Sequence, residues 1–184
     1  MIGVSNTTPL IYLSKADKLH LLKNLFENVH VPTEVYNEAV KSGLSKGYSD
    51  ARRIDATCKD WIIVKPTSVD LGLALVQNVG RHPGIGKMLT GIHAGEVEAI
   101  SLAMERGAKL LIANDRAVIK FVLSIPSLFK FKVIGTGDVL ETALNRGILA
   151  QNDYDDFLRI FGTAAAFVSR EPYQGVAARN IEVM

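Results

Sequence analysis

Cysteine is almost absent from this sequence, and its scarcity excludes several classes of protein. The chain has 184 residues and a single cysteine, Cys58. No internal disulfide framework can form, and no cysteine pair has the spacing of a zinc site. The four histidines also lack a metal-ligand pattern. This composition fits a reducing, cytoplasmic setting rather than an oxidising one.

Long hydrophobic runs and a strong excess of one charge are missing as well. No stretch approaches the roughly 20 apolar residues that a membrane-spanning helix needs. The first residues, Met-Ile-Gly-Val-Ser-Asn, do not have the basic and apolar segments of a signal peptide. We therefore expect no membrane partner. The net charge is only +2, and scattered basic residues do not identify a nucleic-acid-binding protein.

The residues that are present predict one globular α/β domain over 1–184. Hydrophobic residues make up 48% of the chain and charged residues 22%, and a chain of this length buries about 70% of its unfolded surface. Short apolar runs alternate with segments of helical periodicity, which favours a three-layer α/β/α sandwich around a mainly parallel sheet. We expect strands at 2–5, 29–31, 61–64, 110–113 and 132–134.

Several residues predict where the helices begin and end. Asp17 has the character of an N-cap that divides residues 9–26 into two helices. Gly107 and Gly147 follow helical patterns and are expected to end them. Ser49 or Asp50 is expected to cap a helix over 48–60. The stretch at about 67–91 has no clear pattern, and we interpret it as a lid or an insertion.

Oxygen-bearing side chains recur where the predicted strands end. Asn6 follows the first strand, Asn114 and Asp115 follow the strand at 110–113, and Thr136 and Asp138 follow the last. In open parallel sheets, ligands bind outside the carboxyl ends of the strands. The same residue types are also preferred N-caps at strand-to-helix turns. Capping and binding are compatible, so both interpretations stay open for these positions.

Glu96 stands out because its position conflicts with its charge. On the helix predicted over 94–106, it falls near the middle of a broad apolar face, whereas Glu98 and Glu105 fall on the polar side. A carboxylate among core residues is costly unless it is paired, hydrogen-bonded or bound to a metal. The alternative is that the first helical turn favours its charge. Glu38 lies at the margin of the apolar face of the helix that Pro32 opens.

These segments together resemble the PIN-domain proteins, and in particular a prokaryotic subgroup related to VapC-type toxin ribonucleases. The segment Gly-Glu-x-Glu-Ala-Ile-x-Leu-Ala at 95–103 is the most specific piece. The resemblance covers nearly the whole chain except about 67–91. The segments that carry it are 4–11, 31–38, 94–103, 111–116, 133–136 and 146–149.

The resemblance implies a metal-dependent endonuclease that acts on single-stranded RNA with Mg²⁺ or Mn²⁺. Carboxylate and amide oxygens suit such hard cations. The residues carried over by motif are Glu38, Glu96 and Asp115 as catalytic residues, and Asn6, Glu38, Glu96, Asp115 and the adjacent Asn114 as metal ligands. By their chemistry and position, Thr7, Arg116 and Lys120 are candidate contacts to RNA, and a surface role explains the two basic residues equally well.

Asn6 departs from the family pattern, because an Asp usually occupies this position. An amide oxygen can still bind a cation, but it brings no negative charge. The alternative function is therefore a weakened or inactive PIN-like module that binds RNA or a protein. The resemblance also implies a toxin with a small antitoxin partner, and a homodimer. Leu10, Ile11 and Leu22 offer apolar surface for a dimer, and burial in the monomer core explains them equally well.

Overall fold

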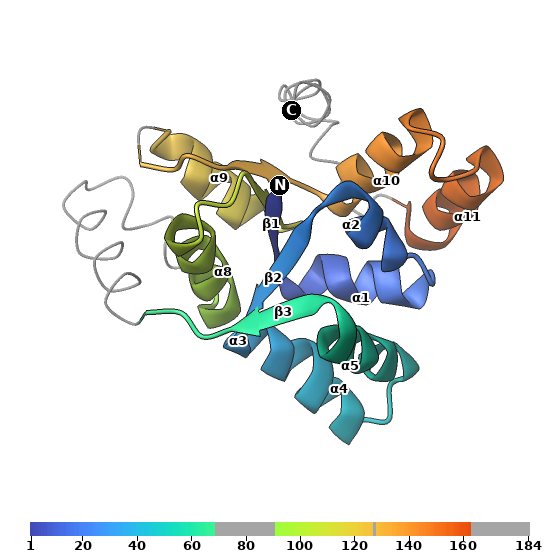
Figure 1. The fold of residues 1–184 in the computed structure, drawn as a ribbon, viewed down its shortest axis with the longest axis horizontal. Coiled ribbons are helices and arrows are strands. Elements are labelled where there is room, and N and C mark those ends of the chain that lie inside the picture. The colour runs from blue at the N-terminus through green and yellow to red at the C-terminus, as the bar shows by residue number, and fades with distance from the viewer. Residues whose placement is uncertain (69–90, 127, 163–184) are drawn as a thin grey trace.

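A single five-stranded sheet forms the centre of the molecule, and every neighbouring pair of its strands is parallel. The computed structural model describes residues 1–68, 91–126 and 128–162. The strand order is β3-β2-β1-β4-β5 (Figure 1). The parallel α/β fold predicted from the sequence is thus confirmed. The strands are β1 (Ile2–Ser5), β2 (Asn28–Pro32), β3 (Ile62–Lys65), β4 (Leu110–Ile112) and β5 (Lys132–Ile134).

The strand register assigns alternate residues to the two faces of the sheet. Val4 of β1 lies beside His30 of β2 and Leu111 of β4, whereas Gly3 lies beside Val29. Val4 and Leu111 belong to one buried hydrophobic cluster, and Val29 belongs to another. Since successive side chains point to opposite faces, each face of the sheet has its own core. The three-layer architecture follows from these two cores.

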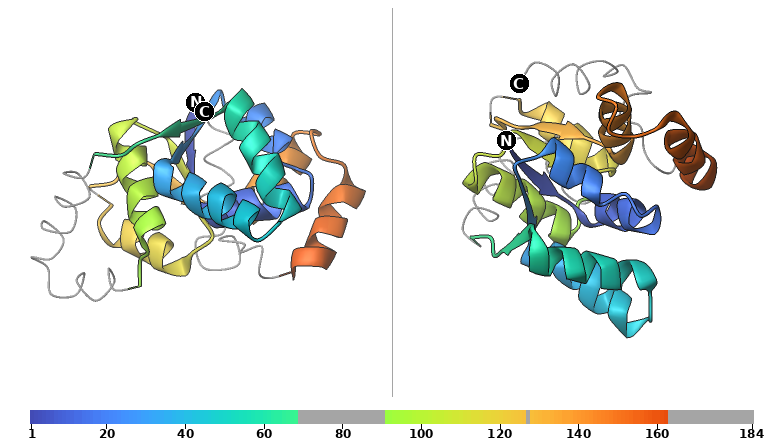
Figure 2. Two further views of the ribbon diagram at one scale, coloured as in Figure 1. Left: turned by 90° about the horizontal axis from the view of Figure 1, so that it is seen from below. Right: turned by 45° about the vertical axis from the view of Figure 1, so that its right-hand side comes forward.

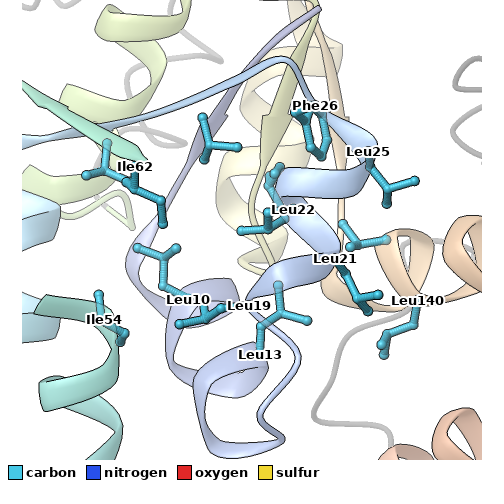
Figure 3. Packing of buried hydrophobic residues seen from close by; sticks show 14 of the residues in the cluster. Leu10, Leu13, Leu19, Leu21, Leu22, Leu25, Phe26, Ile54, Ile62 and Leu140 are labelled. Carbon is cyan, nitrogen blue, oxygen red and sulfur yellow. The ribbon is translucent and has the colours of Figure 1, made fainter. Parts of the chain in front are cut away.

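In the described part of the chain, five helices cover the first face, and the helical segment at 33–41 adds Val35, Ala39 and Val40 to its core. Leu10, Leu13 and Leu22 of the first two helices are fully buried against it (Figure 3). Leu10 and Leu22 therefore belong to the monomer core and do not offer an apolar dimer surface. Ile11 is half-buried and packs against the same cluster. The helices are α1 (Thr7–Lys15), α2 (His20–Leu25), α5 (Ser49–Asp60), α10 (Thr136–Asn145) and α11 (Gln151–Phe161).

The second face is covered by α8 (Ala94–Glu105) and α9 (Arg116–Ser124). Figure 1 shows them on the side of the sheet away from α1, α2 and α10. The ring of Phe121 in α9 packs at a tilt against that of Phe129, with centroids 5.5 Å apart, and the Phe129 ring lies 5.4 Å from that of Phe131. This aromatic group closes the second core beneath α9.

A continuous helical segment follows β2 and contains one irregular turn. It consists of α3 (Thr33–Tyr36), the π-helical turn η1 (Asn37–Lys41) and α4 (Ser42–Ser45). It contacts α5, and the two lie side by side in both views of Figure 2. The sequence predicted a helix opened by Pro32, but it did not predict the π turn. Such turns occur often at functional sites, and this one contains Glu38.

Asp17 does not begin the second helix, and that prediction was wrong. Its φ angle is 58°, in the left-handed region. Its N–H donates to the carbonyl of Ser14 at 3.1 Å, and the N–H of Lys18 donates to Leu13 at 2.7 Å. These two bonds form the Schellman arrangement that closes a helix. Asp17 therefore ends α1, in the role that glycine usually takes.

Gly107 and Gly147 end their helices as predicted, with φ angles of 58° and 67°. The cap of α5 is Tyr48, and its side chain makes no capping hydrogen bond. The predicted caps Ser49 and Asp50 instead form the first turn of that helix.

The stretch interpreted as a lid or insertion, about 67–91, lies almost wholly outside the described residues. None of the helices in the described part of the chain is long and apolar enough to cross a bilayer.

Candidate active site

The strand order places a topological switch point between β1 and β4. From there, the chain continues to β2 and β3 on one side and to β5 on the other. Open α/β sheets bind ligands in the crevice outside the carboxyl ends of the strands at such a point. Asn6 follows β1 directly, and Asn114 and Asp115 follow β4. Three of the residues singled out from the sequence therefore flank the expected crevice.

Asn6 is held firmly at the junction of β1 and α1. It is 4% exposed, and its N–H donates to the carbonyl of Ile112 at 2.9 Å. Its side-chain Oδ1 accepts the N–H of Thr7 at 2.8 Å. Asn6 is thus the N-cap of α1 and also links the end of β1 to β4.

Asp115 is the N-cap of α9. Its Oδ1 accepts the N–H of Ala117 at 2.6 Å, and the side chain is half-buried. The capping interpretation of Asp115 is therefore confirmed. Because one carboxylate oxygen is fixed to the first turn of α9, the orientation of the whole carboxylate is fixed as well. Arg116 begins α9 and Lys120 follows one turn later, both on the exposed side of this helix.

Asn114 is engaged with the last strand-to-helix turn. Its Oδ1 accepts both the N–H of Thr136 at 2.9 Å and the Oγ1 hydroxyl of Thr136 at 3.0 Å. Its buried Nδ2 finds no hydrogen-bond partner among the described residues. The backbone N–H of Thr136 requires an acceptor, so it fixes the amide with its oxygen toward α10. The oxygen of Asn114 is therefore already occupied by two donors.

Glu96 is buried, as its place on the apolar face predicted. It is 8% exposed, and its Oε2 accepts the N–H of His93 at 2.9 Å, across the first turn of α8. Burial raises the pKa of the Glu96 carboxyl, the His93 N–H opposes this shift, and the charges of Asp115 and Glu38 raise the pKa further. Three carboxylates from three separate elements therefore interact electrostatically at this edge of the sheet.

Glu38 reaches the same place from the π turn. Its Oε2 accepts the hydroxyl of Thr7 at 2.6 Å. A Cβ atom added to Gly95 would lie 3.1 Å from both carboxylate oxygens of Glu38. The Glu38 carboxylate thus lies directly against the first turn of α8, next to Glu96. Gly95 permits this close approach because it has no side chain.

The carboxylates do not form a closed metal cage on their own. Within residues 1–68, 91–126 and 128–162, no three His, Cys, Asp or Glu side chains lie together as the ligands of one ion would. The donor set nevertheless suits a hard cation, because it consists of oxygens and Mg²⁺ keeps several of its own waters. A cation would also relieve the repulsion from Asp115 and Glu38 that adds to the effect of burial on the Glu96 pKa.

Sequence reasoning missed two residues that shape this site. Gly95 is the second residue of α8, a position where glycine weakens a helix, and this unfavourable placement was a usable signal. Glu98 was assigned to the polar side of α8, yet its Oε2 accepts the N–H of Glu34 in α3 at 3.2 Å. No local pattern reveals this contact, because its partner is 64 residues away.

A three-layer α/β fold with carboxylates around the switch point of a parallel sheet defines a PIN-like class of protein. A PIN-domain family model (DUF3368) matches residues 2–182, and the chain belongs to this family. PIN domains are generally nucleases and typically use divalent metals. No curated protein and no solved structure matches the chain.

Proposed function

We propose that this protein is a metal-dependent ribonuclease that cleaves single-stranded RNA at the carboxyl edge of its sheet. The observation that carries the proposal is the place of the Glu38 carboxylate against Gly95 in the first turn of α8, next to the buried Glu96. Burial raises the Glu96 pKa, and the charges of Asp115 and Glu38 add to that rise. Carboxylates that repel each other destabilise the fold unless a bound cation compensates their charge. At this edge they match the metal-binding chemistry of the family.

Mg²⁺ or Mn²⁺ is the proposed cofactor, with Glu38, Glu96 and Asp115 as its acidic ligands and Asn6 as a neutral one. When bound, such an ion activates water and stabilises the leaving oxygen of a phosphodiester. Asn114 is left out of the proposed ligands, because two donors of Thr136 already occupy both lone pairs of its oxygen, whereas the Asn6 oxygen accepts the N–H of Thr7 and keeps a second lone pair.

The residues of the chain itself hold the carboxylates in place. The Thr7 hydroxyl orients Glu38, the His93 N–H orients Glu96, and the first turn of α9 orients Asp115. Thr7, first proposed as an RNA contact, therefore acts here mainly on Glu38. Arg116 and Lys120 remain the proposed contacts to the phosphates of RNA, since they lie on the helix that Asp115 opens.

The test is cleavage of a panel of labelled single-stranded RNAs with Mn²⁺, with Mg²⁺ and with EDTA. The matched variant is Asp115→Asn, which removes the charge but keeps a good N-cap. We expect EDTA to abolish cleavage and Asp115→Asn to reduce it by more than about 100-fold, beyond the effect of losing an outer-shell partner. The control is Asp156→Asn on α11, which removes an exposed carboxylate paired with Arg159. Cleavage that survives EDTA would contradict the proposal.

The second candidate is a module that binds RNA without cutting it, and Asn6 favours this alternative. Its amide brings no charge to the site, and its oxygen already accepts the N–H of Thr7. Intact RNA binding in the same panel, with no cleavage under any metal condition, would establish this function instead.

Replacing Asn6 with aspartate is expected to strengthen Mn²⁺ binding by roughly tenfold, because affinity rises with the number of charged ligands. Aspartate also caps helices well, so α1 should keep its N-cap. Isothermal titration calorimetry would measure the change. The matched control is Asn24→Asp, which adds the same charge on the exposed side of α2. Unchanged or weaker binding in Asn6→Asp would remove Asn6 from the ligand set.

We further propose a cytoplasmic toxin that is neutralised by a small antitoxin protein, and a homodimer. The resemblance to VapC-type toxins supports these assignments, rather than any contact in the structure. Growth arrest on induced expression, relieved by co-expression of a small protein encoded by the adjacent gene, would test the toxin role. Light scattering of the purified protein would test the dimer.

A further inference from the structure

Two helical segments meet through a matched pair of contacts beside the candidate site. On α8, Gly95 and Glu98 are three residues apart and lie on one side of the helix. On the segment after β2, Glu34 and Glu38 are four residues apart and also share a side. Gly95 lies against the Glu38 carboxylate, and Glu98 accepts the N–H of Glu34. The elements α3 and α8 are in contact, and Figure 1 shows where they lie in the fold.

The first turn of α3 needs an acceptor that its own cap does not provide. The N-cap is Pro32, which makes no side-chain hydrogen bond. The first N–H groups of a helix have no partner within the helix. Glu98 supplies one from a different helix, with its Oε2 3.2 Å from the nitrogen of Glu34. A negative charge at this end of a helix is favourable, so the contact both caps α3 and attaches it to α8.

This contact bears directly on Glu38, which lies one turn beyond Glu34 in the π turn η1. Glu38 is exposed, and its carboxylate contacts the Thr7 hydroxyl and lies against Gly95. Its place beside Glu96 therefore depends on how the segment after β2 lies against α8. We propose that Glu98 is a positioning residue, which caps α3 from α8 and thereby holds Glu38 over Gly95. In its metal-binding consequence, this inference rests on the proposed function.

The test compares Glu98→Ala, which removes the acceptor, with Glu98→Gln, which keeps a neutral one. The matched control is Glu105→Ala on the same helix, because Glu105 also accepts a distant backbone N–H, that of Ser68 at 2.7 Å. In Glu98→Ala we expect hydrogen exchange of the Glu34 amide to accelerate by about tenfold or more. The carboxyl carbon signal of Glu38 should shift in the same variant. Glu98→Gln should restore most of both, and Glu105→Ala should change neither.

Metal affinity distinguishes the two possible roles of Glu98, because a residue that only caps α3 would not affect it. We expect Glu98→Ala to weaken Mn²⁺ binding by about tenfold while RNA cleavage at saturating Mn²⁺ stays close to that of the wild type. Faster exchange at Glu34 with an unmoved Glu38 signal would overturn the inference. If the wild type binds no Mn²⁺ and cuts no RNA, the proposed function fails, and the Glu38 signal still decides whether Glu98 positions it. Gly95→Ala, which pushes against Glu38 directly, should displace the same signal without exposing the Glu34 amide.

Discussion

Replacing Glu96 with glutamine is expected to reduce metal-dependent RNA cleavage by more than about 100-fold and, at the same time, to stabilise the fold at neutral pH. Glutamine has nearly the same shape, and its oxygen can still accept the N–H of His93. It lacks the negative charge that would bind a cation. The loss of activity therefore follows from the loss of charge and not from a disturbed helix.

The gain in stability follows from the direction of the Glu96 pKa shift. Burial, and then the charges of Asp115 and Glu38, raise this pKa above that of the unfolded chain. The stability that the carboxyl group contributes is fully present below the unfolded pKa and is lost as the pH rises through the folded pKa. At neutral pH the wild type therefore carries an unfavourable buried charge that Glu96→Gln does not.

Urea denaturation at neutral pH and the RNA cleavage assay, run on the same preparations, would measure both effects. The matched control is Glu105→Gln, since Glu105 lies on α8 but is exposed. A variant that loses activity together with stability would mean that Glu96 supports the fold, and the catalytic assignment would then lose its basis. Opposite changes in activity and stability are the signature of a site kept for its chemistry.

Local sequence patterns predicted a helix or strand well where the residues of that element alone determine its structure. Helix α8 follows from its apolar periodicity and from Gly107 at its end, and β4 follows from a short apolar run. The strand order could not be predicted in this way, because it depends on which strands meet in space. The position of the switch point between β1 and β4 therefore came only from the structure.

Asp17 shows how one local preference can override another. An aspartate before a helical pattern favours an N-cap, but here the chain closes α1 through the bond from Lys18 to Leu13. Lys18 also forms an ion pair with Asp153 of α11, at 2.9 Å. This pair attaches the turn to a helix far away along the chain, and no local pattern reveals that contact.

Within the candidate site, the sequence could identify a residue whose charge does not suit its predicted apolar environment. Glu96 was found because a carboxylate on an apolar face requires an explanation. Glu98 and Gly95 were missed because the residues that they contact, Glu34 and Glu38, lie on a segment far away along the chain. The π turn that carries Glu38 was missed too, since no composition rule distinguishes such a turn from an ordinary α-helical one.

Asp138 leads to the second large prediction, which concerns the pH dependence of stability. It is fully buried, and its Oδ2 accepts the N–H of Gly135 at 2.7 Å, whereas its Oδ1 finds no partner among the described residues. Burial raises the pKa of this carboxyl from 3.8 to about 6, the Gly135 N–H opposes the shift, and the charge of Glu141 adds to it. Since the folded pKa is the higher one, the stabilising contribution is present below about pH 4 and is lost as the pH rises through about 6.

Asp138→Asn should remove that dependence while keeping an acceptor for the Gly135 N–H. The full shift corresponds to at most about 3 kcal/mol, so the difference between wild type and variant should change by about 1 to 3 kcal/mol between about pH 4.5 and pH 7.5. Urea denaturation across this range would measure it, with the exposed Asp156→Asn as the control. We expect the two proteins to have similar stability at the acidic end, where both side chains are neutral, and the variant to be the more stable one at the basic end, because only the wild type can lose a buried proton. Parallel curves would mean that Asp138 keeps one protonation state throughout this range, and the turn at Gly135 would then depend on its hydrogen bond alone.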